Sequence, residues 1–142
     1  MIVYADTSFQ ISAYIIDLHS SAAVKKLAAR PRICLTPFSR SEVANAIYRQ
    51  AFIERLSLAE SMRAWQSFES DCAAGVWELL AFPNRAWETC AELARKYAPT
   101  LGVRTPDSLH VACALELKAE RFWTFDERQA QLAEAAGLDT NP

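Results

Sequence analysis

Four acidic side chains stand where a predicted strand ends or a predicted helix begins. They are Asp6, Glu42, Asp107 and Asp126. Carboxylates that meet at close range raise one another's pKa and repel, so a cluster of them normally implies a bound cation. Ligation by oxygen alone favours Mg²⁺ or Mn²⁺ over zinc. A hard cation held by carboxylates suits cleavage of phosphodiester bonds, because it activates a water and neutralises charge on the phosphate.

Each acid, considered alone, also fits an ordinary role at a helix terminus. Asp6 and Asp126 could be N-caps, whose oxygens accept hydrogen bonds from free backbone N–H groups. Glu42 stands three residues after a serine, as in a capping box, and Asp107 would interact favourably with a helix dipole. The local sequence does not choose between cap and metal ligand. The choice depends on whether the fold brings the four acids together.

Strand and helix patterns alternate along the chain. The strands are predicted at 2–5, 33–36, 76–82 and 121–126. The helices are predicted at 8–19, 22–29, 37–55, 58–74, from Trp87 to near Gly102, at 106–115 behind Thr105 as cap, and at 127–137. This alternation predicts a three-layer α/β/α domain with a mostly parallel central sheet of four to five strands. Strand ends and the following helix starts share one edge of such a sheet, so the four acids can converge there on one pocket.

The helix predicted from residue 37 carries a polar stripe. At roughly 100° per residue, Asn45 lies about 60° and Arg49 about 20° around the helix from Glu42. The stripe could be an ordinary solvated face. It could also be an acid flanked by an arginine that faces a phosphate group.

The composition fits a single domain spanning residues 1–142, with 51% hydrophobic and 23% charged residues. No uncharged apolar run approaches the roughly 18 residues that a membrane span needs, and the basic segment of a signal peptide is absent from the N-terminus. We therefore expect a cytoplasmic protein with no membrane partner. The net charge of −2 does not exclude a nuclease, because if four of the 17 acids form a metal site, the remaining 13 face 15 lysines and arginines.

Other residues that could carry chemistry are expected to pack in the core. The four cysteines, at positions 34, 72, 90 and 113, form no closely spaced pair for zinc. His110 lies in the apolar segment LHVACAL, and metal chemistry of the kind above requires no imidazole base. The tryptophans fall on strands or apolar helix faces, at Trp65, Trp77, Trp87 and Trp123.

Four segments together resemble a PIN domain, and more narrowly the VapC toxin ribonucleases of bacterial type II toxin–antitoxin pairs. They are YADTSF (4–9), SEVANA (41–46), RTPDSLHVACAL (104–115) and FWTFDERQAQLAEAAGL (122–138). No single motif is specific, but the order and the length match over essentially the whole chain. The resemblance implies an endoribonuclease dependent on Mg²⁺, with Mn²⁺ as a possible substitute. It also implies a homodimer and inhibition by a small VapB-like antitoxin.

The resemblance also assigns roles to individual residues. The four acids match the catalytic metal site of the family, with Asp6 and Asp107 holding the principal Mg²⁺. The supporting polar residues that match are Thr7, Ser8, Asn45 and Thr124. Candidate contacts to the phosphates of an RNA substrate are Arg40, Arg49 and Arg104.

Other readings of the same pattern differ in what they require. A response-regulator receiver needs an acceptor Asp after its third strand, where Ala81, Phe82 and Pro83 stand here. A phosphatase of the haloacid-dehalogenase type needs a second Asp two residues after Asp6, where Ser8 stands. A PIN nuclease of RNA maturation without an antitoxin, and a non-catalytic PIN module that only binds a partner, remain alternatives to a toxin.

Overall fold

The computed structural model describes residues 1–140, and four parallel strands form its single sheet. The order across the sheet is β3-β2-β1-β4. The strands are β1 (Ile2–Ala5), β2 (Arg32–Leu35), β3 (Trp77–Leu79) and β4 (Arg121–Trp123). Val3 of β1 lies opposite Ile33 on one side and Arg121 on the other, so β1 is an inner strand. The predicted α/β class and parallel sheet are confirmed.

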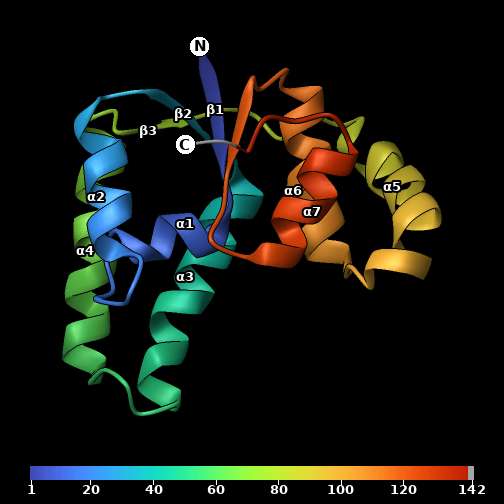
Figure 1. Ribbon diagram of the computed structural model, residues 1–142. Coiled ribbons are helices and arrows are strands. Elements are labelled where there is room, and N and C mark those ends of the chain that lie inside the picture. Colours follow the sequence, from blue (N-terminus) through green and yellow to red (C-terminus); the bar gives the residue numbers. More distant parts are fainter. Residues whose placement is uncertain (141–142) are drawn as a thin grey trace.

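Helices cover both faces of the sheet (Figure 1). They are α1 (Thr7–Ser12), α2 (Ser20–Ala28), α3 (Pro37–Phe52), α4 (Leu58–Ala73), α5 (Ala86–Leu101), α6 (Thr105–Glu116) and α7 (Glu127–Ala135). Within residues 1–140, no helix is both long enough and apolar enough to cross a lipid bilayer.

Alternate residues of β1 supply two separate cores. Val3 and Ala5 pack with residues of α1, α2, α3 and α4 on one face. Tyr4, between them, packs with residues of α5, α6 and α7 on the other face. Side chains alternate between the faces of a strand, so a fully buried strand must be apolar at every position. An acidic side chain can therefore follow this strand but cannot lie within it, and Asp6 is the first residue after it.

Several predicted element ends are wrong. The strand predicted at 76–82 is β3, Trp77–Leu79, and the helices predicted to end at 55 and 137 end at Phe52 and Ala135. At three further ends, a polar side chain stops the element early. The helix predicted at 8–19 ends at Ser12, where the Ser12 hydroxyl and the His19 N–H donate to the Asp17 carboxylate. Such local hydrogen bonds offer the backbone an alternative to helix. Thr36 and Asp126 were predicted as the last residues of strands, but they are the N-caps of α3 and α7.

Smaller corrections concern α6 and the exposure of side chains. The N-cap of α6 is Arg104, and Thr105 lies inside the helix. The prediction that every tryptophan is buried is wrong for Trp87, which is 61% exposed and contacts Phe82 with one face of its ring. Trp77 and Trp123 are buried as predicted. All four cysteines are free thiols, and only Cys72 is not fully buried.

Candidate active site at the carboxyl ends of the strands

One pocket of about 340 Å³ is lined by all four acids that the sequence singles out. Its lining residues are Asp6, Thr7, Ser8, Glu42, Arg104, Pro106, Asp107, His110, Asp126 and Gln129. The pocket lies where β1 and β4 end and where α3, α6 and α7 begin. The carboxyl edge of a parallel sheet is the usual place for a ligand site, since loops and helix starts from several strands meet there.

Asp6 is both a helix cap and a wall of the pocket. It follows β1 directly, and one carboxylate oxygen, Oδ1, accepts from the Phe9 N–H at 3.0 Å and from the Ser8 hydroxyl at 2.6 Å. The other oxygen, Oδ2, accepts from the Thr124 hydroxyl. Burial raises the pKa of Asp6, although these hydrogen bonds and the nearby His110 oppose that rise. The result is a buried carboxyl in a fixed orientation.

Two hydroxyls join the end of β1 to the end of β4 around Asp6. The Ser8 oxygen accepts from the Phe125 N–H at 2.9 Å, and the Thr124 oxygen accepts from the Asp126 N–H at 2.9 Å. Each hydroxyl therefore ties Asp6 to the backbone of the loop that carries Asp126. These contacts give the supporting residues Ser8 and Thr124 a definite structural role.

Asp107 and Asp126 each cap a helix with one oxygen. Asp107 Oδ2 accepts from the Arg104 N–H at 2.8 Å, and Asp126 Oδ1 accepts from the Gln129 N–H at 2.9 Å. The Gln129 amide donates to the Asp107 carbonyl at 3.2 Å and so links the starts of α6 and α7. Within the described chain, the second oxygen of each carboxylate accepts no hydrogen bond.

Glu42 faces these acids from α3, and it is held by a hydroxyl and an imidazole. Its Oε1 accepts from the Thr7 hydroxyl at 2.8 Å and from His110 Nε2. Partial burial raises the pKa of Glu42, but the hydrogen bond and charge of His110 and the bond from Thr7 outweigh that effect and lower it overall. Its Oε2 has no hydrogen-bond donor among residues 1–140.

The donor set of the pocket fits a hard cation. Glu42, Asp107 and Asp126 each keep one oxygen without a donor in the described part of the chain, as ligands for Mg²⁺ or Mn²⁺ would. Within residues 1–140, however, no three His, Cys, Asp or Glu side chains lie close enough to form a preassembled metal site.

Two further hollows adjoin the acidic pocket on either side. One, of about 530 Å³, shares Thr7 and Glu42 with the pocket and contains Asn45 and Arg49. The other, of about 660 Å³, shares Arg104, Asp107 and Asp126 with the pocket and adds residues of α7 and the loop before it. We call these three hollows, which are joined by shared lining residues, the trough; Arg49 lines one of them and Arg104 lines the other two.

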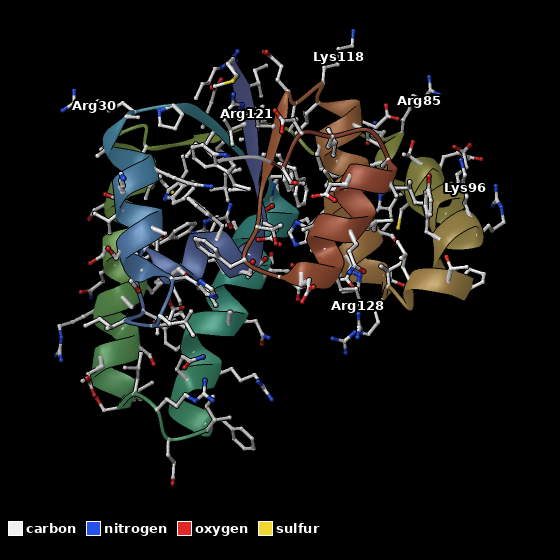
Figure 2. The ribbon with its side chains drawn as sticks, viewed as in Figure 1. Arg30, Arg85, Lys96, Lys118, Arg121 and Arg128 are labelled. Atoms are coloured by element: carbon white, nitrogen blue, oxygen red, sulfur yellow. The ribbon has the colours of Figure 1, made fainter. Side chains whose placement is uncertain are left out.

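Only two of the three candidate arginines line the trough. Arg49 and Arg104 line it, whereas Arg40 pairs with Glu69 and lies over the ring of Trp65 at 4.9 Å. Arg128, which the sequence did not single out, lines the hollow beside Arg104 and lies near the start of α7 (Figure 2).

His110 is the main residue of the site that sequence reasoning missed. It is buried as predicted, at 3% exposure, but it also lines the pocket and contacts Glu42. One signal was available in the sequence. His110 follows Asp107 by three residues, and residues three apart lie on the same side of a helix.

Comparisons with known proteins agree on one family. The family model of the PIN domain matches residues 3–135. A search of curated proteins finds no significant match. Among solved structures, the sarcin–ricin-loop-cleaving toxin VapC20 of Mycobacterium tuberculosis is similar, with a TM-score of 0.74, 15% identity and 99% of each chain covered.

Two other solved structures show the same fold. VapBC2 of Rickettsia felis, bound to a DNA fragment from its promoter, matches with a TM-score of 0.67 and 15% identity, covering 99% of this chain and 98% of that one. PAE2754 of Pyrobaculum aerophilum matches with a TM-score of 0.63 and 16% identity, covering 96% and 86%. Because the family model spans nearly the whole sequence, this chain belongs to the PIN domain family.

Proposed function

We propose that this chain is a metal-dependent endoribonuclease and the toxin of a type II toxin–antitoxin pair. The observation that carries the proposal is that, in a PIN domain, all four acids line one pocket at the carboxyl ends of the strands. Two of the structures that share the fold are described as a toxin that cleaves the sarcin–ricin loop and as a VapBC assembly on promoter DNA.

The proposed metal is Mg²⁺, with Mn²⁺ as a substitute. Asp6 and Asp107 would be its principal holders, and Glu42 and Asp126 would complete the set directly or through water. When bound, such a cation would activate a water for attack on the phosphate and neutralise the charge that develops there. The oxygens of Glu42, Asp107 and Asp126 that lack a protein donor support the roles of these three acids. Both oxygens of Asp6 accept hydrogen bonds, so its role rests on its match to the family pattern and on its place in the pocket.

The other residues of the pocket hold the acids in place. Ser8 and Thr124 fix both oxygens of Asp6, and Thr7 fixes one oxygen of Glu42. Fixed ligands lower the cost of reorganisation when charge develops in the reaction. Asn45 lies beside Glu42 in the adjoining hollow, where it can donate to a substrate oxygen.

An extended polyanion fits the surroundings of the pocket better than a small phosphate ester does. The trough continues beyond the acids on both sides, and it carries Arg49 in one hollow and Arg104 with Arg128 in the other. Arginines bind phosphates along a nucleic-acid backbone. We therefore propose that Arg49 and Arg104 bind phosphates on either side of the bond that is cut. The proposed substrate is a cytoplasmic RNA.

Exposed apolar side chains support the proposed protein partners, a second copy of the chain and a VapB-like antitoxin. Ile16 and Leu18 are 97% and 86% exposed in the loop before α2, and Phe52 is 84% exposed at the end of α3. Surfaces of this kind often serve as interfaces. Co-expression with the product of a small upstream reading frame should yield a stable complex with reduced nuclease activity. A PIN nuclease of RNA maturation would have no such inhibitor.

The catalytic proposal is tested with purified protein and RNA. Cleavage should require Mg²⁺ or Mn²⁺, stop in EDTA, and be lost in Asp6→Asn and Asp107→Asn, which keep the shape of each cap. Glu60→Gln is the matched control, because Glu60 also accepts from a backbone N–H at a helix start but lies in the capping box of α4, outside the pocket. Binding of RNA without cleavage by wild-type protein would favour a non-catalytic PIN module. Cleavage that survives both Asp variants would refute the assignment.

A further inference from the structure

A buried chain of polar side chains runs from β1 to the acidic pocket. The Tyr4 hydroxyl lies 3.1 Å from the Ser39 oxygen and 2.8 Å from His110 Nδ1. The other ring nitrogen, Nε2, contacts Glu42 Oε1 and lies 3.2 Å from the Thr7 oxygen. Ser39, Tyr4 and His110 are all buried, so no bulk water competes for the bonds among these three, whereas the Glu42 side chain is 29% exposed.

The contacts determine which ring nitrogen must carry a proton. The ionised Glu42 carboxylate can only accept hydrogen bonds, so a lone pair on Nε2 would repel it. Nε2 therefore carries a proton and donates to Glu42, whether Nδ1 accepts from Tyr4 or donates to it. Both arrangements are satisfied, because Ser39 can reverse its role with Thr36, 3.4 Å away.

This series of hydrogen-bonded side chains fixes the orientation of the Glu42 carboxylate. Oε1 is engaged by Thr7 and His110, and Oε2 is left without a donor in the described residues. The His110 ring cannot swing away easily, because it packs against Phe38 with ring centres 4.7 Å apart and edge-on against Tyr4 at 5.8 Å. A buried ring thus holds one oxygen of Glu42 and leaves the other for the pocket.

We infer that His110, fixed by Tyr4, is a positioning residue that orients Glu42 for divalent metal binding. The inference rests on the proposed function. His110 does not touch the reacting phosphate in this account, and it acts through Glu42. Side chains that orient metal ligands from behind typically contribute about 10- to 100-fold to metal affinity or activity.

The first test measures Mn²⁺ affinity by calorimetry on the purified protein. His110→Leu removes the donor and should weaken Mn²⁺ binding about 10- to 100-fold. His110→Gln retains an N–H that can reach Glu42 and should recover most of the affinity. Equal losses in the two variants, with both folded by circular dichroism, would overturn the inference.

A pair of tyrosine variants removes one oxygen atom each and controls for packing. Tyr4→Phe should weaken Mn²⁺ binding severalfold, while the aromatic ring at position 4 remains stacked on Phe122. Tyr14→Phe is the matched control, because its hydroxyl also has two side-chain partners, Asp71 at 2.6 Å and Trp77 at 2.5 Å, but belongs to the opposite core. It should lower thermal stability and leave Mn²⁺ affinity unchanged. The same Mn²⁺ affinity for Tyr4→Phe and wild type would count against the inference.

A double-mutant cycle separates positioning from a general structural effect. If His110 acts through Glu42, His110→Leu should have little further effect on Mn²⁺ affinity once Glu42 is replaced by Gln. A structural defect would weaken binding equally in both backgrounds. Fully additive losses would therefore overturn the inference.

A spectroscopic arm distinguishes failure of this inference from failure of the proposed function. Nitrogen-15 spectra of the His110 ring should show a protonated Nε2 whose signal shifts in Glu42→Gln without any metal. If wild-type protein binds no Mn²⁺ and cuts no RNA, the proposed function fails, and the role of His110 in metal binding fails with it. The nitrogen-15 signal would still show whether His110 Nε2 donates to Glu42. If wild-type protein binds Mn²⁺ and cuts RNA but His110→Leu matches it, only the inference fails.

Discussion

Two pockets of similar size lie at opposite ends of the strands, and they differ in chemistry. The pocket at the amino ends of β2 and β3 measures about 390 Å³ and is lined by Leu27, Arg30, Pro31, Ile33, Ala74, Gly75 and Val76. The pocket at the carboxyl ends measures about 340 Å³ and contains four carboxylates, two hydroxyls and a histidine. Size therefore does not single out the candidate site, whereas the side chains do.

The difference follows from the direction of the strands. Parallel strands all deliver the next residue of the chain to the same edge, and the helices that follow start there with free N–H groups. Acids are favoured at helix starts, so Asp6, Asp107 and Asp126 can each cap a helix and still share one pocket. At the amino edge, helices α2 and α4 end instead, and their last carbonyls would repel anionic ligands and carboxylates.

The largest expected effect comes from removing an acid of the carboxyl edge. Asp107→Asn should reduce RNA cleavage by about a hundredfold or more, since the loss of a ligand should exceed the loss of a residue behind it. Arg30 lines the other pocket, and its side chain is labelled in Figure 2; Arg30→Gln should leave cleavage unchanged. Cleavage rates at saturating Mg²⁺ measure both. A larger loss in Arg30→Gln would reverse the comparison.

A smaller loss is expected from a hydroxyl that holds Asp6. Thr124→Val removes the bond to Asp6 Oδ2 and should lower cleavage roughly tenfold, because the ligand becomes less fixed. Thr89→Val is a matched control, since the Thr89 hydroxyl donates to Glu116 at 2.7 Å between α5 and α6, outside the pocket. It should cleave RNA at the wild-type rate. Equal rates for the two variants would show that the hydroxyl of Thr124 is dispensable.

Arginines should affect RNA affinity rather than the chemical step. Arg49→Ala and Arg104→Ala should each weaken RNA binding severalfold and make it less dependent on salt, because each removes one phosphate contact. Arg40→Ala should have no such effect, since Arg40 is paired with Glu69 on α4. Fluorescence anisotropy at two salt concentrations measures the change. An effect of Arg40→Ala as large as that of Arg49→Ala would place the RNA elsewhere.

The smallest effect is a gain in stability. Burial raises the pKa of Asp6, so the folded protein holds this proton more tightly than the unfolded chain does, and metal-free stability falls as pH rises from the usual Asp pKa through the raised one. Asp6→Asn lacks this loss and can still cap α1. Its melting temperature without metal should be a few degrees higher than that of wild type at neutral pH. The gap should close at acidic pH or with added Mg²⁺, and a lower melting temperature would contradict the account.

Much of the site could be predicted because the reasons for it are local. An apolar strand followed by an acid and a helix start fixes where Asp6 and Asp126 emerge, and the parallel sheet places them at one edge. The contact between His110 and Glu42 could not be predicted, because it joins α6 to α3 across 68 positions of sequence. The apolar context of His110 indicated burial and gave no sign of a polar partner.

Other misses arose where two physical effects competed. Helix propensity continues past Ser12, but the Asp17 carboxylate draws the backbone into turns. Trp87 has the right spacing for a buried helix face, yet the buried residues of α5 are Ala86, Cys90 and Leu93, and the Trp87 ring is 61% exposed. Periodicity indicates that a helix has a buried face and does not fix which neighbouring positions lie at its centre.

If the acids of the carboxyl edge form a metal-dependent nuclease site, metal binding and RNA cleavage must be linked. A Mn²⁺ titration of wild-type protein, followed both by calorimetry and by cleavage of labelled RNA, measures this link. Cleavage and binding should rise together at the same Mn²⁺ concentration, and both should be lost in Asp107→Asn. RNA cleavage in the presence of EDTA, or unchanged Mn²⁺ binding by Asp107→Asn, would show that the site is not a metal-dependent nuclease site.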